Sequence, residues 1–255
     1  MRYMWDRFDD YFSFKKNGII TTVAAYLVRP FLKWWDYQVS QSHNVDLIIT
    51  NSHFISKKVK QHYGRDSKVI NPFVDYETFY PKKSIQKKNY FLAFGAFAPY
   101  KRFDLVIDVF LRLKNLNLII AGSGQDELFI KQKITSASNI KLMIHPKDDD
   151  LPSLYQEARA FLFPGLEDFG ITPLESLAAN TPVIAYAHGG VLDSVTKETG
   201  IFFNEQTPES LEKALLEFIE KETFFSLDQC SERASHFTKQ QFKTSFQKIA
   251  QSFSL

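Results

Sequence analysis

Two glutamates in the segment EDFGITPLE have the residue types and spacing that could do chemistry. Glu167 and Glu175 are separated by seven residues, so on one continuous helix they would lie about 80° out of line. They therefore do not form a carboxylate pair along a helix. Gly170 instead predicts that Glu167 lies in a loop, while Thr172 and Pro173 suit the N-cap and the first position of a new helix.

The position of Glu175 leaves two interpretations open. As the third helical residue it could complete a capping box with Thr172, which is a purely structural role. No capping role of this kind accounts for Glu167. It is predicted to lie on a loop beside a helix N-terminus, where N–H groups and the helix dipole favour the binding of an anion. A site that holds phosphate and keeps carboxylates nearby suits a ligand with both phosphate and hydroxyl groups. A nucleotide sugar has both.

The elements that must position these residues follow a regular rhythm from Tyr90 onward. Short apolar segments predict strands over 90–94, 117–122, 140–144, 161–164, 182–186 and 200–203. Helices are predicted over 101–113, from 126, over 151–160, from 172 and over 208–221. This alternation indicates the α/β class, with a Rossmann-like parallel sheet and helices on both faces. Ligands of such sheets bind beyond the carboxyl ends of the strands.

The first 89 residues are less regular. VDLIITNS predicts a buried strand, and FISKKVKQHYG predicts a helix that Gly64 closes. PKKSIQKKN is interpreted as a solvated connector rather than a basic membrane-attracted patch. We therefore expect three parts: an incomplete N-terminal domain remnant with its linker at 1–85, the Rossmann-like domain at 86–221, and a helical tail at 222–255.

Composition limits the classes of protein to consider. The formal charge of +2 over 255 residues makes nucleic acid an unexpected partner. Cys230 is the only cysteine, which excludes an internal disulfide framework and favours a reducing, cytoplasmic compartment. The six histidines show no metal-binding spacing, so we expect no metal and no cofactor. GSG after the second strand lacks the third glycine of a dinucleotide fingerprint.

An aromatic-rich opening contains all three tryptophans, Trp5, Trp34 and Trp35. Its longest apolar stretch, GIITTVAAYLV, is too short to cross a bilayer. We interpret these aromatic side chains as a core face whose sheet is incomplete. The alternative is a helix that lies on a membrane surface, which would place the protein at the inner face of the membrane.

The segment EDFGITPLE resembles the E-x7-E motif of the retaining GT-B glycosyltransferases of family 4. Other segments resemble consecutive blocks of that family in the family's order: NSHFISKKVKQHYG, VINPFVDYETF, FGAFAPYKRFDLVI, IIAGSGQDE, LPSLYQEARAFLFPGLEDFGITPLESLAANTPVIAYAHGG and ASHFTKQQF. MRYMWD and WDYQVSQSHNVDLIITNS are similar to the mannosyltransferase-like branch. The resemblance implies that residues 86–221 form the C-terminal, donor-binding half of a GT-B enzyme.

The resemblance assigns a role to each matching position. Lys101, in PYKR, would neutralise the leaving diphosphate, and Glu167 would contact hydroxyls of the donor sugar, so these two would be the catalytic residues. Glu175 would bind the ribose hydroxyls. The other donor-binding positions would be Gly95, Arg102, Phe169, Gly170, Ile171 and Thr172. The implied reaction transfers a hexose, for example mannose from GDP-mannose, with retention to a lipid-linked or polysaccharide acceptor.

Two departures from the family pattern leave alternatives open. Gly95-Ala96 replaces the usual glycine-arginine pair, so one diphosphate-binding arginine is absent, and Arg102 is the cation that could compensate. We also expect the early strands of the acceptor half to lie upstream of Met1. The chain is then an active transferase, a donor-binding half that needs a partner chain, or a nucleotide-sugar-binding remnant without turnover. An epimerase or phosphorylase on a related scaffold is the rival enzyme class.

Overall fold

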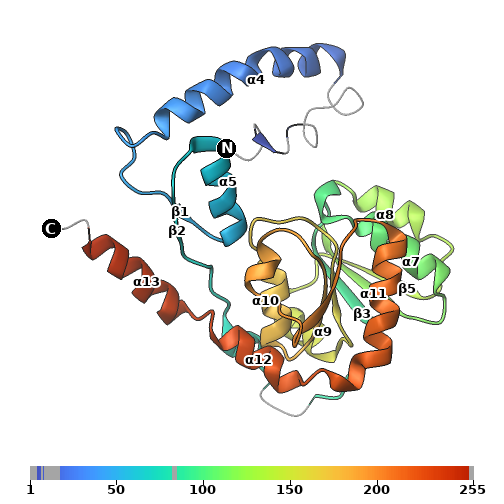
Figure 1. Cartoon of the computed structure of the whole chain (residues 1–255). Coiled ribbons are helices and arrows are strands. Elements are labelled where there is room, and N and C mark those ends of the chain that lie inside the picture. The colour runs from blue at the N-terminus through green and yellow to red at the C-terminus, as the bar shows by residue number, and fades with distance from the viewer. Residues whose placement is uncertain (1–4, 7, 9–17, 82–84, 253–255) are drawn as a thin grey trace. The chain divides into compact units, whose positions relative to one another are not determined.

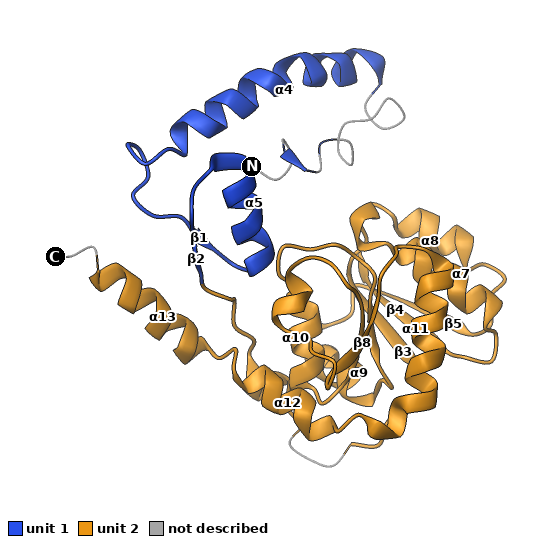
Figure 2. Ribbon diagram, viewed as in Figure 1, with its two compact units in different colours: residues 1–69 blue, residues 70–255 orange. Residues whose placement is uncertain are grey.

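The computed structural model describes residues 5, 6, 8, 18–81 and 85–252 of the chain. The chain divides into two compact units, residues 1–69 and residues 70–255 (Figure 2). The smaller unit contains the long helix α4 (Ile19–Val39), and the larger unit contains the main sheet. The three-part division at residues 85 and 221 that the sequence suggested stays a prediction.

The larger unit is built on a six-stranded sheet in which every pairing is parallel. Its strands along the chain are β3 (Phe91–Ala96), β4 (Leu118–Ser123), β5 (Ile140–Ile144), β6 (Phe161–Phe163), β7 (Val183–Tyr186) and β8 (Gly200–Phe203). They lie in the order β5-β4-β3-β6-β7-β8, so the order reverses between β3 and β6. Such a reversal leaves a crevice at the carboxyl ends of the two central strands. All six predicted strands are confirmed.

Helices cover both faces of this sheet, as the alternating pattern predicted (Figure 1). One face is covered by α7 (Phe103–Arg112), α8 (Glu127–Lys133) and α11 (Pro208–Lys221). The other face is covered by α6 (Tyr76–Phe79), α9 (Leu151–Glu157), α10 (Ile171–Ala178) and α12 (Leu227–Ser235). The chain continues through the short helix η4 (Glu222–Phe224) before α12 and ends with α13 (Lys239–Gln251).

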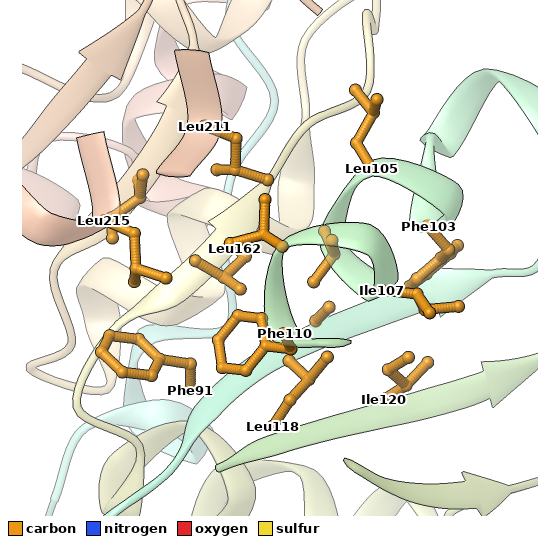
Figure 3. Packing of buried hydrophobic residues seen from close by; sticks show 14 of the residues in the cluster. Phe91, Phe103, Leu105, Ile107, Phe110, Leu118, Ile120, Leu162, Leu211 and Leu215 are labelled. Carbon is orange, nitrogen blue, oxygen red and sulfur yellow. The ribbon is translucent and has the colours of Figure 1, made fainter. Parts of the chain in front are cut away.

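The core between the first helical layer and the sheet is aromatic and aliphatic (Figure 3). Phe110 of α7 and Leu215 of α11 are fully buried, as is Phe91 of β3, and Leu118 of β4 is 1% exposed. Burying each such side chain contributes roughly 1.5–3 kcal/mol relative to leaving it in water. The strand ends that carry the functional loops are therefore held by packing on both sides of the sheet.

The smaller unit is described by itself. After α4 it contains β1 (Ile49–Thr50), α5 (His53–Tyr63) and β2 (Lys68–Val69), and β1 pairs with β2 in parallel. Ser52 caps α5 by accepting from Ile55 N at 3.1 Å, and Gly64 ends it in the left-handed conformation, as the sequence predicted. The strand predicted over VDLIITNS is much shorter, because only two of its residues pair with β2. None of the described helices combines the length and apolarity needed to span a bilayer.

In the connector PKKSIQKKN, Lys88 is exposed, as the prediction of a solvated segment requires, whereas Lys87 is not. Residues 82–84 lie outside the described residues. Lys87 donates to Asn180 O at 2.9 Å and to Thr181 Oγ1 at 2.6 Å, beyond the end of α10. Burial lowers the pKa of Lys87 to about 8. The two hydrogen bonds therefore tie the connector to the C-terminal end of the helix that carries Glu175.

Candidate active site

The ends of β3 and β6 bring the two predicted catalytic residues together. Lys101 ends the short 3₁₀ helix η1 (Pro99–Lys101) after β3, and Glu167 lies in the loop after β6. Because these strands are neighbours at the point where the strand order reverses, both loops open at the same crevice. Lys101 Nζ forms an ion pair with Glu167 Oε1, and the two side chains are 12% and 17% exposed.

Glycines allow the loops around this ion pair to approach one another closely. A Cβ at Gly165 would lie 3.0 Å from Lys101 Cα, so the loop after β6 packs directly against η1. Gly190, the first residue of η3 (Gly190–Asp193) after β7, donates its N–H to Glu167 O at 2.9 Å. A Cβ at Gly190 would lie 2.0 Å from a backbone oxygen of the same loop. Neighbouring loops therefore fix the backbone of Glu167 from two sides.

The capping box that the sequence suggested at the start of α10 is wrong. Gly170 rather than Thr172 is the N-cap, and its φ of 87° is a left-handed value that favours glycine. The helix therefore begins at Ile171, and Thr172 lies in its first turn. Thr172 Oγ1 is buried and has no hydrogen-bond partner within the described part of the chain. The first N–H groups of α10, like those of any helix, have no partner within the helix, and its first turn carries no acidic residue.

Glu175 makes its hydrogen bond with a different element. Its Oε2 accepts from the hydroxyl of Tyr155, on α9, at 2.9 Å. Tyr155 is fully buried, and its ring packs against Phe94 of β3 and Phe161 of β6 at centroid distances of 6.0 and 5.3 Å. Packing of the ring against the two central strands thus fixes the position of the Tyr155 hydroxyl. It anchors the carboxylate of Glu175 at the same crevice.

Four groups of the site are electrostatically linked. Burial raises the pKa of Glu175, while the hydrogen bond from Tyr155 and the positive charge of Lys101 oppose that rise. Burial and the charges of Glu175 and Glu167 together hold the pKa of Tyr155 well above its ordinary value. These effects require that Lys101 and both glutamates lie close enough to interact. The structure therefore brings together the lysine and the two acids that the sequence singled out.

The other predicted donor-binding positions surround this cluster unequally. Gly95, in β3, lies beside the lysine, because a Cβ there would be 3.4 Å from Lys101 Nζ. The guanidinium of Arg102 is held by the Asp104 carboxylate, with contacts of 2.9 to 3.2 Å, at the start of α7. Phe169 is 3% exposed and packs into the core, so only its backbone could meet a ligand. The ligand-binding roles of all these positions stay predictions.

Across the residues that the structure describes, no group of three or more histidine, cysteine, aspartate or glutamate side chains is arranged to hold a metal ion. Cys230 is buried in the core beside α10, and burial raises the pKa of its thiol to about 12. Its thiol therefore stays protonated at neutral pH, which makes it a poor nucleophile and a poor ligand.

A comparison with known protein families identifies the family of this chain. The model of the family described as glycosyl transferases group 1 matches residues 75–239, which include the whole six-stranded sheet and the cluster around Lys101. The chain belongs to this family. The O-antigen chain mannosyltransferase RfbU of Salmonella typhimurium is 29% identical to it over 187 residues, which cover 66% of this chain and 49% of RfbU. The alpha-1,3/1,6-mannosyltransferase alg2 of Schizosaccharomyces pombe is 27% identical over 196 residues, covering 59% of this chain and 38% of alg2.

Solved structures of similar fold agree with this family assignment. HepE of Anabaena, crystallised in complex with UDP, superimposes with a TM-score of 0.69 at 21% identity, covering 82% of this chain and 63% of HepE. Sucrose-phosphate synthase from Thermosynechococcus elongatus gives a TM-score of 0.71 at 18% identity, covering 83% and 59%. The Rossmann-like GT-B architecture is thereby confirmed. The chain spans about half the length of the curated relatives that it matches.

Sequence reasoning missed Tyr155 and the glycines that support Glu167. Tyr155 sits in LPSLYQEARA, where a helical pattern marks it only as a core residue, so nothing in the sequence signals its bond to Glu175. Gly165 and Gly190 do carry a signal, because each lies in a loop directly after a predicted strand. A glycine at such a position often marks a close backbone approach. That signal could have located the loops that hold the acid.

Proposed function

We propose that this chain binds a nucleotide-diphosphate sugar and contains the donor half of a retaining hexosyltransferase. One observation carries the proposal: a lysine, a helix start and two separated carboxylates converge where the sheet order reverses. The diphosphate and the sugars of such a ligand would each meet chemically complementary groups there. Phosphates suit the cation and the helix start, whereas sugar hydroxyls suit the carboxylates.

The diphosphate would lie between Lys101 and the start of α10. The ammonium supplies a full charge, and the N–H groups of Ile171 and Thr172 add the partial positive charge of the helix end. Thr172 Oγ1, which is buried without a partner in the described chain, could donate to a phosphate oxygen. Such a donor would satisfy a hydroxyl that otherwise costs free energy by its burial.

The two glutamates would bind different parts of the ligand. Glu175, anchored by Tyr155, would accept hydrogen bonds from the ribose hydroxyls. Glu167 would accept from hydroxyls of the transferred sugar. As the bond between C1 and the diphosphate breaks, its electron pair goes to the diphosphate oxygen. Lys101 and the helix start would stabilise that charge without reorganising, which is the form of stabilisation that usually contributes most to catalysis.

Binding of the diphosphate must rearrange the ion pair between Lys101 and Glu167. In this structure Glu167 compensates the charge of Lys101. A diphosphate oxygen would compete for the ammonium, and the freed carboxylate would then accept from sugar hydroxyls. A free nucleotide offers no such hydroxyls to Glu167. The ion pair would therefore make the affinity for a nucleotide sugar higher than the affinity for the free nucleotide.

The comparisons support this assignment of the ligand class. RfbU and alg2 are named as mannosyltransferases, and HepE was crystallised with UDP and with UDP-glucose. We accordingly propose a hexose, with mannose from GDP-mannose as the first candidate donor, and a lipid-linked or polysaccharide acceptor. No cofactor is required for this chemistry, because the leaving charge is met by fixed cations and N–H dipoles.

Calorimetry with GDP, UDP, GDP-mannose and UDP-glucose tests the donor site. Lys101→Ala and Glu175→Ala should each weaken binding of the preferred nucleotide by about tenfold or more, since each removes a charge-assisted contact of roughly 1.5–3 kcal/mol. Lys88→Ala is the matched control, because it breaks a lysine–glutamate pair with Glu157, 2.7 Å long, outside the crevice. Unchanged affinity in both site variants would reject the proposal.

Glu167→Gln separates sugar recognition from nucleotide recognition. Removing the carboxylate charge frees Lys101, so affinity for the free nucleoside diphosphate should be retained or increased. The preference for the nucleotide sugar over the nucleotide should disappear. Glu157→Gln, at the partner of Lys88, is the matched control. Equal losses of nucleotide and nucleotide-sugar affinity would contradict the assignment of Glu167 to the sugar.

A second candidate is a donor-binding half that works only with a partner chain. A likeness at TM-score 0.70 to a structure named the GtfA/B complex shows that the same fold occurs in an assembly. Sugar transfer or donor hydrolysis by the isolated chain would support the first function. Tight donor binding without either activity, with turnover that appears only when a partner polypeptide is added, would support the second.

A further inference from the structure

Arg102 is the residue at which the chain turns from η1 into α7, directly after Lys101. It ends η1 and is also the N-cap of α7, with φ 57° and ψ 40°. These angles are left-handed, a conformation that costs free energy for every residue except glycine and that asparagine and aspartate adopt more readily than arginine. A left-handed arginine at this turn therefore needs a compensating interaction.

The segments on both sides of the turn are held by their own contacts. Before it, the N–H of Arg102 donates to Pro99 O at 3.1 Å and closes η1. After it, Phe103 is 6% exposed, and its ring meets that of Phe97 edge-on at a centroid distance of 5.1 Å. Since η1 and α7 are each held, the backbone angles of residue 102 set the position of Lys101 relative to α7.

The side chain of Arg102 forms a forked ion pair with Asp104. Its Nε donates to Oδ1 at 3.0 Å, and its Nη2 donates to Oδ2 at 2.9 Å. Among the residues that the structure describes, the guanidinium hydrogen-bonds to Asp104 alone. The two side chains are 30% and 34% exposed. At such exposure the fixed geometry of a fork, rather than charge by itself, allows an ion pair to contribute.

Asp104 is a fixed partner for this fork. It lies in the first turn of α7, where the helix dipole favours a carboxylate. Its backbone oxygen accepts from Lys133 Nζ of α8 at 3.4 Å, and the same ammonium pairs with Asp108 at 2.8 Å. The fork thus links the turn after Lys101 to a helix that α8 and the sheet hold in place.

We propose that Arg102 is a positioning residue, whose fork to Asp104 holds the left-handed turn that places Lys101 beside Glu167. The proposal rests on the proposed donor site, and it gives Arg102 a different role from the compensating cation that the sequence suggested. In the fork, Asp104 compensates the guanidinium charge, which weakens its attraction for a phosphate. Without the fork the turn would relax in part of the molecules. Nucleotide affinity would then fall with the fraction that keeps Lys101 in place.

Acetylation of the full chain without nucleotide, read at each lysine by mass spectrometry, tests the position of Lys101 by itself. Lys101 is 12% exposed and paired with Glu167, so it should be acetylated slowly in the wild type. Arg102→Ala removes the fork and should raise the rate at Lys101 by about fivefold or more. Arg102→Gly also removes the fork, but glycine adopts the left-handed turn without cost, so its rate should stay at least about threefold below that of Arg102→Ala.

Nucleotide affinity then tests the consequence for the site. Calorimetry with GDP or UDP, whichever the wild type binds more tightly, should show Arg102→Ala and Arg102→Lys weakened by about fivefold or more, because lysine keeps the charge but cannot form the fork. Arg102→Gly should bind at least about threefold more tightly than Arg102→Ala. An arginine that bound the phosphate directly would give the opposite order, with lysine best and glycine equal to alanine, and that order would overturn the proposal.

Variants of Asp104 and Arg112 complete the test. Asp104→Ala should match Arg102→Ala in both measurements, and the double variant should lose no more affinity than either single variant. Arg112→Ala is the matched control, because it breaks a pair with Glu209, 2.8 Å long, at the other end of α7. Both of its measurements should stay at the wild-type values. Additive losses, or equal acetylation rates at Lys101 in the wild type, Arg102→Ala and Arg102→Gly, would overturn the proposal.

The two measurements separate this proposal from that of the donor site. If the chain binds neither GDP nor UDP, the donor-site proposal fails, while the acetylation pattern still decides whether Arg102 holds Lys101 in place. Circular dichroism of each variant verifies that the fold is kept.

Discussion

Tyr155→Phe is the most specific perturbation of the site, because it removes one hydroxyl and keeps the ring that packs between the central strands and α9. The lost contact is the 2.9 Å bond to Glu175 Oε2. A hydrogen bond to an ionised acceptor is worth roughly 1.5–3 kcal/mol, and the remaining carboxylate stays largely buried. The variant should therefore be destabilised by about 1.5–3 kcal/mol at pH 8.

The pH dependence of nucleotide binding should change more distinctively than its strength. Burial already raises the pKa of Glu175, and the Tyr155 bond opposes that rise. Without the bond the pKa rises further, so the carboxylate takes up a proton at a higher pH. A protonated Glu175 accepts ribose hydroxyls poorly, so affinity falls as the pH falls. The midpoint of that fall should move upward by about one pH unit or more, since each unit corresponds to about 1.4 kcal/mol.

Calorimetric titration of the preferred nucleoside diphosphate between pH 5 and pH 8.5, in steps of about half a unit, measures this midpoint. Tyr90→Phe is the matched control, because the Tyr90 hydroxyl donates to Leu154 O at 2.9 Å and does not contact Glu175. Its pH profile should coincide with that of the wild type. Identical profiles for Tyr155→Phe and the wild type would refute the claim that Tyr155 controls Glu175.

Two further predictions concern charge. Ala96→Arg restores the cation that the family pattern places before η1, at an exposed position at the end of β3. Calorimetry should show that this variant binds the nucleoside diphosphate about tenfold more tightly. The control variant Ala96→Gln should bind it with unchanged affinity. Equal affinities of the two variants would show that no phosphate lies there. The lowered pKa of Lys87 means that the unfolded chain binds more protons between pH 8 and 10.5, so this residue should make the free energy of unfolding rise with pH across that window. Lys87→Met should flatten the rise by up to about 3 kcal/mol in urea unfolding, and identical slopes would contradict the buried contact of Lys87 with Asn180.

The sheet of the larger unit could be predicted because its sequence signals are local. Each strand from Phe91 to Phe203 is a short apolar run followed by a glycine or charged loop, and each crossover helix has an apolar face. The strand order was not predicted, because alternation of strands and helices does not show that the order reverses between β3 and β6. The same signals placed Glu167 in a loop beyond a strand, whereas Lys101 was assigned to the site from the resemblance of PYKR to the family pattern.

The predictions failed where a contact between distant segments decides the outcome. Cap chemistry pointed to Thr172, but the left-handed backbone of Gly170 starts α10 earlier and leaves Glu175 free to bond Tyr155. Lys87 looked solvated because its neighbours are polar, yet the carbonyl of Asn180 draws it against α10. Neither partner is near in sequence, so propensity and spacing could not reveal it.

The orientation of α4 within its unit is a third case of this kind, because Asp36 is buried and Trp34 is exposed. Its composition gave both a core-face and a membrane-surface interpretation. The bonds from Trp5 and Tyr63 to Asp36 show which side of the helix is held inward. A buried aspartate with two donors from separate segments has no signature in a hydropathy pattern.

A crystal structure of this chain bound to GDP-mannose or UDP-glucose, whichever binds more tightly in solution, tests the donor-site assignment most directly. We predict that the diphosphate lies at the start of α10 with an oxygen within hydrogen-bond distance of Lys101 Nζ, and that the ribose hydroxyls contact Glu175. Density for the nucleotide at any other part of the sheet, with the Lys101 and Glu167 pair undisturbed, would contradict the account.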